Sequence, residues 1–154
     1  VRQARSTLAE LDTLRDDERA GEEFTPDDAV AHLRLAAGGV DGSTPVIVRG
    51  EGTTTVSFPA ETVRTVGAAL AEALRNSVRH AGSADRSVEV DLADDGLTVV
   101  VRDDGPGFDP DAVPAHRLGI RVSIVDRMSR LPGGSVEVRS AQGRGTQVTL
   151  GWRR

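Results

Sequence analysis

The chain has 154 residues, of which 38% are hydrophobic and 28% are charged, and its net charge is -5. These proportions are typical of one soluble globular domain, and the negative balance argues against a nucleic-acid-binding surface. The chain has no cysteine, which excludes disulfides, thiolate metal sites and cysteine nucleophiles. All 19 basic residues are arginine, so no lysine is present for Schiff-base chemistry or for a Walker A loop.

No apolar run approaches the roughly 20 residues that cross a bilayer, and the N-terminus lacks the apolar stretch of a signal peptide. We therefore expect a cytoplasmic chain without membrane contact, and we leave open whether the full-length protein is anchored in a membrane. Because the chain begins with Val1 rather than methionine, we also expect a processed protein or a fragment of a longer one.

The first 23 residues are polar and predict a helical linker that ends near Gly21. Its apolar positions, Leu8, Leu11 and Leu14, have helical spacing. The apolar stripe is short, so we expect this chain to be monomeric.

A domain of residues 24–154 follows, and its first elements are two helices separated by a hairpin. Thr25 and Pro26 begin a helix that the pair Gly38-Gly39 ends. Residues 45–49 and 54–58 have β-like runs and predict a hairpin. Pro59 and Ala60 then introduce the most strongly periodic helix, whose predicted buried stripe is Val63, Val66, Leu70, Leu74 and Val78.

The second half alternates hairpins with a loop and a helix. Strands are predicted at 87–92 and 97–101 and again at 135–139 and 146–151. Between the two pairs, a loop rich in glycine, proline and aspartate (105–118) leads into a helix (119–131). The order predicts an α/β sandwich, with one mixed, largely antiparallel sheet that carries helices on one face.

Glu72, Asn76 and His80 share one face of the long helix because they are four residues apart. Carboxylate and carboxamide oxygens suit a hard cation such as magnesium. Taken alone, this spacing is more typical of a solvated helix face than of a metal site.

Three glycine-bearing segments follow that helix. Asp103-Asp104-Gly105-Pro106-Gly107 directly follows an apolar strand, and an ionised carboxylate there accepts hydrogen bonds only, which favours an adenine amine over a guanine carbonyl. Gly119 opens a helix whose free amides could hold phosphate. Gly143-Arg144-Gly145-Thr146 lies between two strands. Singly, the three segments are also typical of an acidic turn, an ordinary helix start and a hairpin turn.

The order of these four elements resembles the GHKL ATPases, which share the Bergerat ATP-binding fold, and specifically the catalytic domains of bacterial sensor histidine kinases. The resemblance covers residues 24–152 and is strongest after Pro59, and it implies that the helical linker of residues 1–23 could be the tail of a dimerisation helix. It implies a domain that binds ATP and magnesium and donates the γ-phosphate to a histidine on a separate dimerisation domain of the same kinase, which then serves a response regulator.

The resemblance also implies a role for each motif residue. Asn76 would bind magnesium, Glu72 would be catalytic by orienting a metal-bound water or the phosphate, and Asp103 would bind the adenine amine. Four further groups of residues would bind the cofactor. Arg79 and His80 would lie near the phosphates, and Gly105, Gly107 and Gly119 would belong to a lid of residues 106–118 and its hinges. Arg117 stands in place of a glycine that is frequent in such kinases, and Gly143, Gly145 and Thr146 would lie behind the adenine.

None of the three histidines has the acidic successor that is typical of a phosphoacceptor, since His32, His80 and His116 precede Leu33, Ala81 and Arg117. We therefore expect the acceptor to lie outside this chain. Two alternatives stay open: a serine kinase of the anti-sigma-factor type, and a degenerate module that holds nucleotide or a partner without phosphotransfer.

Overall fold

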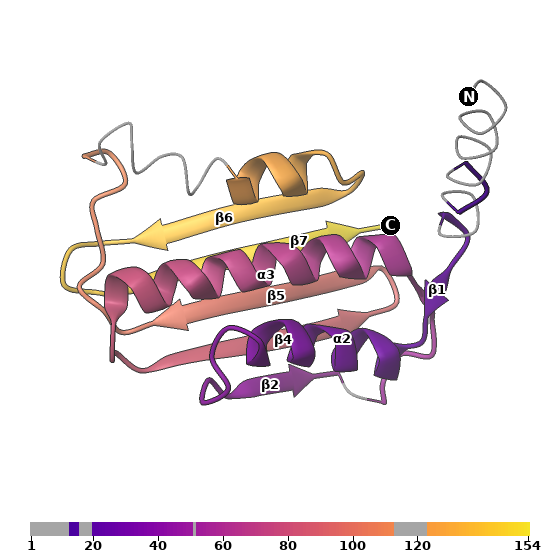
Figure 1. The fold of residues 1–154 in the computed structure, drawn as a ribbon, viewed down its shortest axis with the longest axis horizontal. Coiled ribbons are helices and arrows are strands. Elements are labelled where there is room, and N and C mark those ends of the chain that lie inside the picture. Colours follow the sequence, from indigo (N-terminus) through magenta and orange to yellow (C-terminus); the bar gives the residue numbers. More distant parts are fainter. Residues whose placement is uncertain (1–12, 16–19, 51, 113–122) are drawn as a thin grey trace, which may run out of the picture.

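A computed structural model of the chain describes residues 13–15, 20–50, 52–112 and 123–154 (Figure 1). Its main sheet has five strands in the order β2-β4-β5-β7-β6. Only β2 and β4 run parallel, and the other neighbours pair antiparallel. This arrangement confirms the predicted mixed, largely antiparallel sheet. Its strands are β2 (Val46–Arg49), β4 (Arg86–Ala93), β5 (Gly96–Asp103), β6 (Gly134–Ser140) and β7 (Thr146–Arg153).

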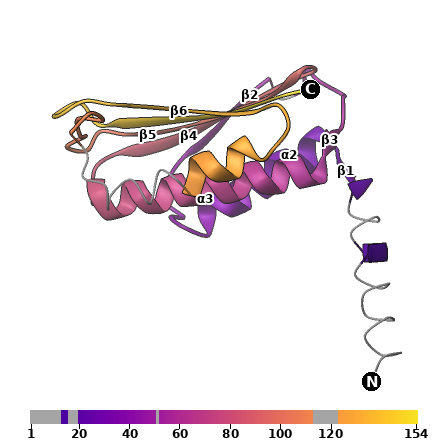
Figure 2. The ribbon, with the colours of Figure 1, turned by 90° about the horizontal axis from the view of Figure 1, so that it is seen from above.

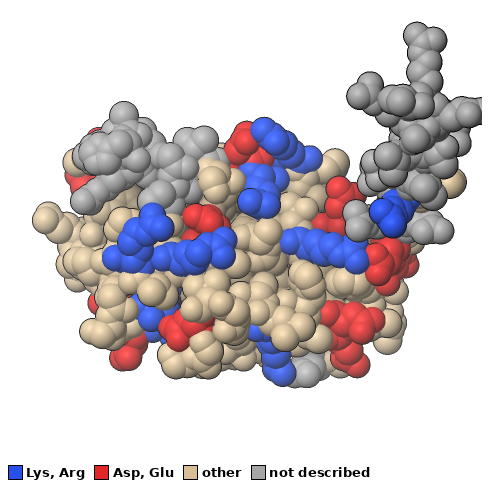
Figure 3. Space-filling model, viewed as in Figure 1, with Lys and Arg blue, Asp and Glu red and all other residues tan. Residues whose placement is uncertain are grey.

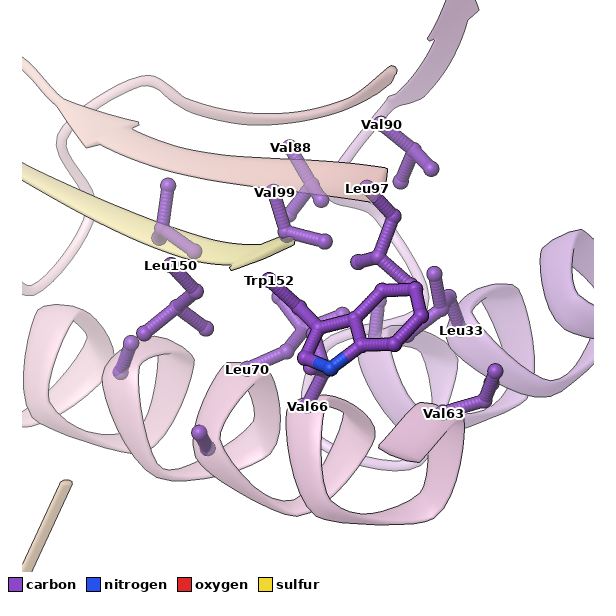
Figure 4. Close-up of a cluster of buried hydrophobic side chains, with 14 of the residues drawn as sticks. Leu33, Val63, Val66, Leu70, Val88, Val90, Leu97, Val99, Leu150 and Trp152 are labelled. Atoms are coloured by element: carbon purple, nitrogen blue, oxygen red, sulfur yellow. The ribbon is translucent and has the colours of Figure 1, made fainter. Parts of the chain in front are cut away.

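Three described helices lie on one face of this sheet, as predicted (Figure 2). They are α2 (Pro26–Gly38), α3 (Ala60–Ala81) and a short helix at 123–129. The core fills the space between helices and sheet, with Leu33 and Leu70 from the helices packed towards Val99 and Leu150 from the strands (Figure 4). One apolar layer therefore holds the whole sandwich together.

Thr25 caps α2, which confirms the predicted helix start. The Thr25 hydroxyl accepts a hydrogen bond from the Asp28 amide at 3.2 Å, and the Asp28 carboxylate accepts one from the Thr25 amide at 3.3 Å. This reciprocal capping box satisfies amide groups that the first turn leaves without partners. Pro26 is compatible with the same turn because an amide hydrogen at this position would have no partner within the helix.

The long helix α3 was predicted correctly except for its last apolar position. Val63, Val66, Leu70 and Leu74 are fully buried, whereas Val78 is 40% exposed. Each step of four residues turns the helix roughly 40° past a full revolution, so three such steps carry Val78 about 120° away from Val66. Ser77 returns to within about 20° of Val66 and is buried instead.

Both hairpins in the second half are confirmed. Ala93 pairs with Gly96, so Asp94 and Asp95 form a two-residue turn between β4 and β5. Strands β6 and β7 pair from Ser140 opposite Thr146 onward. The two hairpins are joined by the pairing of β5 with β7, which places Asp103 opposite Thr146 at one end of the sheet.

The predicted hairpin of residues 45–49 and 54–58 is wrong. Strand β2 pairs in parallel with β4 instead. The second run contributes only its last residue to a separate two-stranded sheet, in which β3 (Phe58–Pro59) pairs with β1 (Glu23–Phe24). Val46 and Val48 pack against the core, and Phe58 is fully buried. Burial of these apolar side chains on different neighbours outweighs the local turn signal at Gly50 and Gly52.

Two predicted helices lie partly outside the described residues. Of the linker helix, only residues 13–15 and 20 are described, and they are helical. Of the helix predicted from 119 to 131, residues 123–129 are helical, while 119–122 lie outside the described residues. In the part of the chain that the structure describes, no helix is long and apolar enough to cross a bilayer.

Candidate functional site

A cavity of about 630 Å³ opens beside the C-terminal half of α3, against the end of β5, the middle of β6 and the start of β7. In Figure 1 this is the left end of the sandwich. One side of the cavity is apolar, and several polar side chains border the rest. The apolar lining includes Ala73, Val101, Phe108, Ile124, Val136, Val138 and Val148, and the polar lining includes Asn76, Ser77, Arg79, His80, Asp103, Asp109, Gln142 and Thr146.

Asp103 is the buried carboxylate of this cavity. It is the last residue of β5, and only 9% of it is exposed. Its Oδ1 accepts a hydrogen bond from the Gly105 amide at 3.0 Å, and its Oδ2 accepts none from the described residues. Among the described residues no buried side-chain oxygen lacks a partner, so this unpaired Oδ2 is accessible rather than enclosed by protein. Asp103 is therefore oriented by its own loop and can accept a hydrogen bond from a ligand in the cavity.

Two glycines let the backbone close tightly behind Asp103. Gly107 has φ of +62°, and a Cβ there would lie 2.1 Å from the carbonyl oxygen of Ala141. Gly145 has φ of +73°, and a Cβ there would lie 2.0 Å from the carbonyl oxygen of Asp103 itself. Only glycine fits either position. The loop after β5 and the turn between β6 and β7 thus form one packed unit.

Ser140 joins the same two segments and was not singled out from the sequence. Its Oγ accepts a hydrogen bond from the Phe108 amide at 2.9 Å and donates one to the Gly145 carbonyl at 2.9 Å. It also lies 3.0 Å from Oγ1 of Thr146, a residue that lines the cavity. A serine at the end of a predicted strand carries no sequence signal that separates it from any other polar strand end.

The C-terminal half of α3 forms the opposite wall. Asn76 is half-buried, and Arg79 and His80 are exposed at the cavity edge. Within the described residues, Arg79 and His80 make no ion pair or side-chain hydrogen bond. Arginine side chains also lie along the exposed face of α3, among acidic ones (Figure 3). The cavity therefore has an uncompensated guanidinium at its mouth, which suits an anionic ligand.

Glu72 does not line the cavity. Its Oε2 accepts hydrogen bonds from Nη2 of Arg75 at 2.8 Å and from Nε of Arg75 at 3.2 Å. The pair is partly exposed, with 26% of the Glu72 side chain and 52% of the Arg75 side chain accessible. An exposed pair of this kind contributes about 0–1 kcal/mol, so Arg75 is easily displaced.

The structure thus brings six of the predicted site residues to one cavity: Asn76, Arg79, His80, Asp103, Gly107 and Thr146. Gly105, Gly143 and Gly145 lie in the adjoining loop and turn without lining it. Arg117 and Gly119 lie outside the described residues. In the described ranges no cluster of three or more histidine, aspartate or glutamate side chains could hold a metal. A cation here would need oxygens from its ligand in addition to Asn76.

A second cavity of about 680 Å³ lies at the other end of α3, near Pro59 and Trp152. Its carboxylates include Glu22 and Asp126, whose side chains are 43% and 52% exposed and pair with Arg64 and Arg130. It is slightly larger than the first cavity, but it has no buried carboxylate with a free oxygen. The chemistry of the lining, rather than the size, favours the first cavity as the binding site.

The sequence of residues 61–154 matches the family described as histidine kinase-, DNA gyrase B- and HSP90-like ATPases. The chain is 30% identical, over 86% of its length, to an uncharacterized sensor-like histidine kinase of Chloroflexus aurantiacus. It is 38% identical, over 51% of its length, to the sensor histidine kinase LiaS of Bacillus subtilis. The matched regions are 22% and 21% of those two proteins, so the chain spans about a fifth of the length of these relatives.

Solved structures share the fold. The catalytic domain of the histidine kinase ThkA superposes with a TM-score of 0.61 at 13% identity, covering 86% of this chain and 94% of that one. The mycobacterial sensor histidine kinase MprB gives 0.59 at 17% identity, with 86% and 96% covered. The histidine kinase domain of the Erythrobacter litoralis EL346 blue-light activated kinase gives 0.55 at 25% identity, with 87% and 66% covered. The predicted Bergerat fold is confirmed.

Proposed function

The chain belongs to the family of histidine kinase-, DNA gyrase B- and HSP90-like ATPases, the GHKL group, and from that membership we propose that it binds ATP with magnesium and donates the γ-phosphate to a histidine. The observation that carries the proposal is the carboxylate of Asp103, which lines the cavity and has one unpaired oxygen, together with the unpaired guanidinium of Arg79 at the cavity mouth. The relatives are sensor histidine kinases, which favours histidine as the acceptor.

In this proposal the base lies against the apolar lining and its exocyclic amine donates to Asp103. The free Oδ2 supplies the acceptor, and the Gly105 amide holds the carboxylate in place. Val101 and Val148 are inward-facing residues of neighbouring strands and would contact the ring. Thr146 lies beside the carboxylate through the β5 to β7 pairing and would support the same edge of the base.

The phosphates would then lie towards α3, where Arg79 and His80 have no competing partners among the described residues. Asn76 would supply one oxygen ligand to magnesium, whose other ligands are phosphate and water. Magnesium, when bound, neutralises charge on the phosphates. Glu72 would orient the reacting groups after exchanging its contact with Arg75.

The acceptor histidine would come from a dimerisation domain of the same kinase, and a response regulator would receive the phosphate from it. We propose a cytoplasmic location for this reaction, and a monomeric state for this chain on its own. Because the chain spans about a fifth of its relatives, the acceptor domain would belong to the remainder of a longer protein.

The binding step is tested by calorimetric titration with a non-hydrolysable ATP analogue, with and without magnesium. We expect Asp103→Ala to abolish measurable binding and Asn76→Ala to remove only the increase in affinity that magnesium produces. If magnesium changes the affinity of neither the parent chain nor Asn76→Ala, the role proposed for Asn76 is contradicted. Val78→Ala, a change at an exposed α3 position that does not line the cavity, is the control.

The transfer step is tested in the longer protein that we expect to contain this chain, by incubation with γ-labelled ATP. Histidine as acceptor predicts a label that alkali preserves and acid removes. A label with the opposite stability would indicate a serine acceptor, as in the kinases of the anti-sigma-factor type. The absence of any label from a protein that binds ATP would favour a degenerate binding module.

A further inference from the structure

The guanidinium of Arg86 connects three segments at the end of α3. Arg86 is the first residue of β4, and its Nε donates to Oγ of Ser77 at 3.2 Å. Its Nη1 donates to Oδ2 of Asp41 at 3.0 Å, and its Nη2 donates to the carbonyl of Gly82. Only 10% of the Arg86 side chain is exposed. The planar guanidinium thus ties the α2 to β2 loop, the helix and the sheet together.

The last turn of α3 is largely exposed, apart from the close approach of Ala81 to Gly105. Ser77 is the last buried residue of the helix, since Val78, Arg79 and His80 are exposed and Ala81 is half-buried. Gly82, which follows the helix, has φ of +56°. The two groups that flank this exposed turn, the Ser77 hydroxyl and the Gly82 carbonyl, both bind Arg86. Arg86 therefore fixes the turn that carries Arg79 and His80.

Asp41 holds the guanidinium in turn. Its Oδ1 accepts hydrogen bonds from the Ser43 amide at 3.0 Å and the Ser43 hydroxyl at 2.6 Å, and its Oδ2 accepts one from Oγ1 of Thr44 at 2.9 Å. These hydrogen bonds, followed by the one from Arg86, keep the pKa of Asp41 far below its usual range. The carboxylate is therefore charged, and Ser43 and Thr44 orient it towards Arg86.

Arg86 also stands opposite Asp103 in the pairing of β4 with β5. The β4 strand therefore fixes Asp103 by backbone pairing and the end of α3 by the Arg86 side chain. On the basis of the proposed function, we propose that Arg86, anchored by Asp41, is a positioning residue that sets the phosphate and magnesium groups of α3 relative to the adenine-binding carboxylate.

The proposal predicts that a change at Arg86 affects the affinities for the adenosine and triphosphate parts of the ligand differently. Asp103 keeps its own supports, the Gly105 amide and the Gly145 turn, when Arg86 is changed. Adenosine affinity should then be conserved while affinity for the triphosphate falls. Residues that orient metal ligands typically change metal affinity by about 10–100-fold, so we expect a loss at the lower end of that range.

The test compares Arg86→Gln, Asp41→Asn and the control Arg49→Gln with the parent chain. Arg49 lies on the same sheet, where its exposed side chain pairs with Glu89 at 2.6 Å, away from the cavity. Adenosine binding is followed by NMR titration, and binding of magnesium with a non-hydrolysable ATP analogue by calorimetry. Thermal unfolding of each variant sets an assay temperature at which all are folded, and Asp41→Asn, the milder change, serves where Arg86→Gln does not fold.

We expect Arg86→Gln to weaken the magnesium-dependent binding of the ATP analogue about tenfold, with adenosine affinity within about twofold of the parent value and Arg49→Gln unchanged. Asp41→Asn should act in the same direction with a smaller effect. Equal losses for adenosine and the analogue, or no loss for either, would overturn the inference while the proposed function stands. A parent chain that binds neither ligand would overturn both.

Discussion

Replacement of Gly145 by alanine tests whether the turn between β6 and β7 positions Asp103. Gly143 in the same turn provides a matched control, because its φ of +76° is close to the +73° of Gly145. Both substitutions incur the cost of an L-residue with left-handed backbone, roughly 1–2 kcal/mol. The two positions differ in the space around the added carbon, since a Cβ at Gly143 would meet no atom within 4 Å.

At Gly145 the added Cβ would lie 2.0 Å from the carbonyl oxygen of Asp103, and ordinary contacts begin at about 3.4 Å, so the turn and Asp103 must separate by about 1.4 Å. Overpacking of this kind costs about 1–3 kcal/mol more. A displacement of about 1 Å in a binding group can cost up to about 100-fold in function. We therefore expect Gly145→Ala to bind the ATP analogue at least about tenfold more weakly than Gly143→Ala.

The assay is calorimetric titration of both variants with the magnesium-bound ATP analogue, alongside chemical denaturation. Gly145→Ala should unfold at lower denaturant concentration than Gly143→Ala, as well as bind more weakly. Equal stability and equal affinity of the two variants would refute the view that the close approach of this turn positions Asp103.

Three further predictions follow from single contacts. Ser140→Ala removes the hydroxyl that accepts from the Phe108 amide, so the free energy of unfolding should fall by about 1–2 kcal/mol and nucleotide binding should weaken. The control Ser135→Ala removes only a 3.5 Å contact at the far end of the same strand and should leave both quantities unchanged. Leu70→Ala should lower the free energy of unfolding by about 2–5 kcal/mol in denaturant titration, because Leu70 is fully buried, and a loss below 1 kcal/mol would contradict the packing described. Burial, and then Arg64, lowers the pKa of His32, so the folded state binds a proton less readily than the unfolded state. The free energy of unfolding should therefore decline as the pH falls from about 6.5. His32→Asn should flatten that decline, and an unchanged dependence of stability on pH would contradict the prediction.

Most of the fold could be predicted from local patterns in the sequence. The capping residue Thr25, the periodic positions of α3 and the turn at Asp94 and Asp95 each act through near neighbours in the chain. The pairing of β2 with β4 could not be predicted in the same way, because it joins Val46 to Val88 across the whole of α3. The local glycine signal at residues 50–52 predicted a hairpin that these distant contacts exclude.

The candidate site, like the fold, could be predicted from the sequence only in part. The resemblance identified Asn76, Asp103 and Thr146, and the structure brings them to one cavity, although their roles stay predictions. Ser140 and Arg86 could not be found from the sequence, because their importance rests on partners 32 and 45 residues away. A polar residue at a strand end looks the same in a sequence whether it is solvated or bonded to a distant loop.

The central claim is that Asp103 makes the cavity an adenine-nucleotide site. The most direct test is calorimetric titration of the parent chain and Asp103→Asn with magnesium-bound, non-hydrolysable analogues of ATP and GTP. Guanine presents a carbonyl where adenine presents an amine, and a carboxylate cannot donate to it. The parent chain should prefer the ATP analogue by at least about tenfold, and Asp103→Asn should lose most of that preference. Equal affinity of the parent chain for both analogues, or an unchanged preference in Asp103→Asn, would contradict the assignment of Asp103.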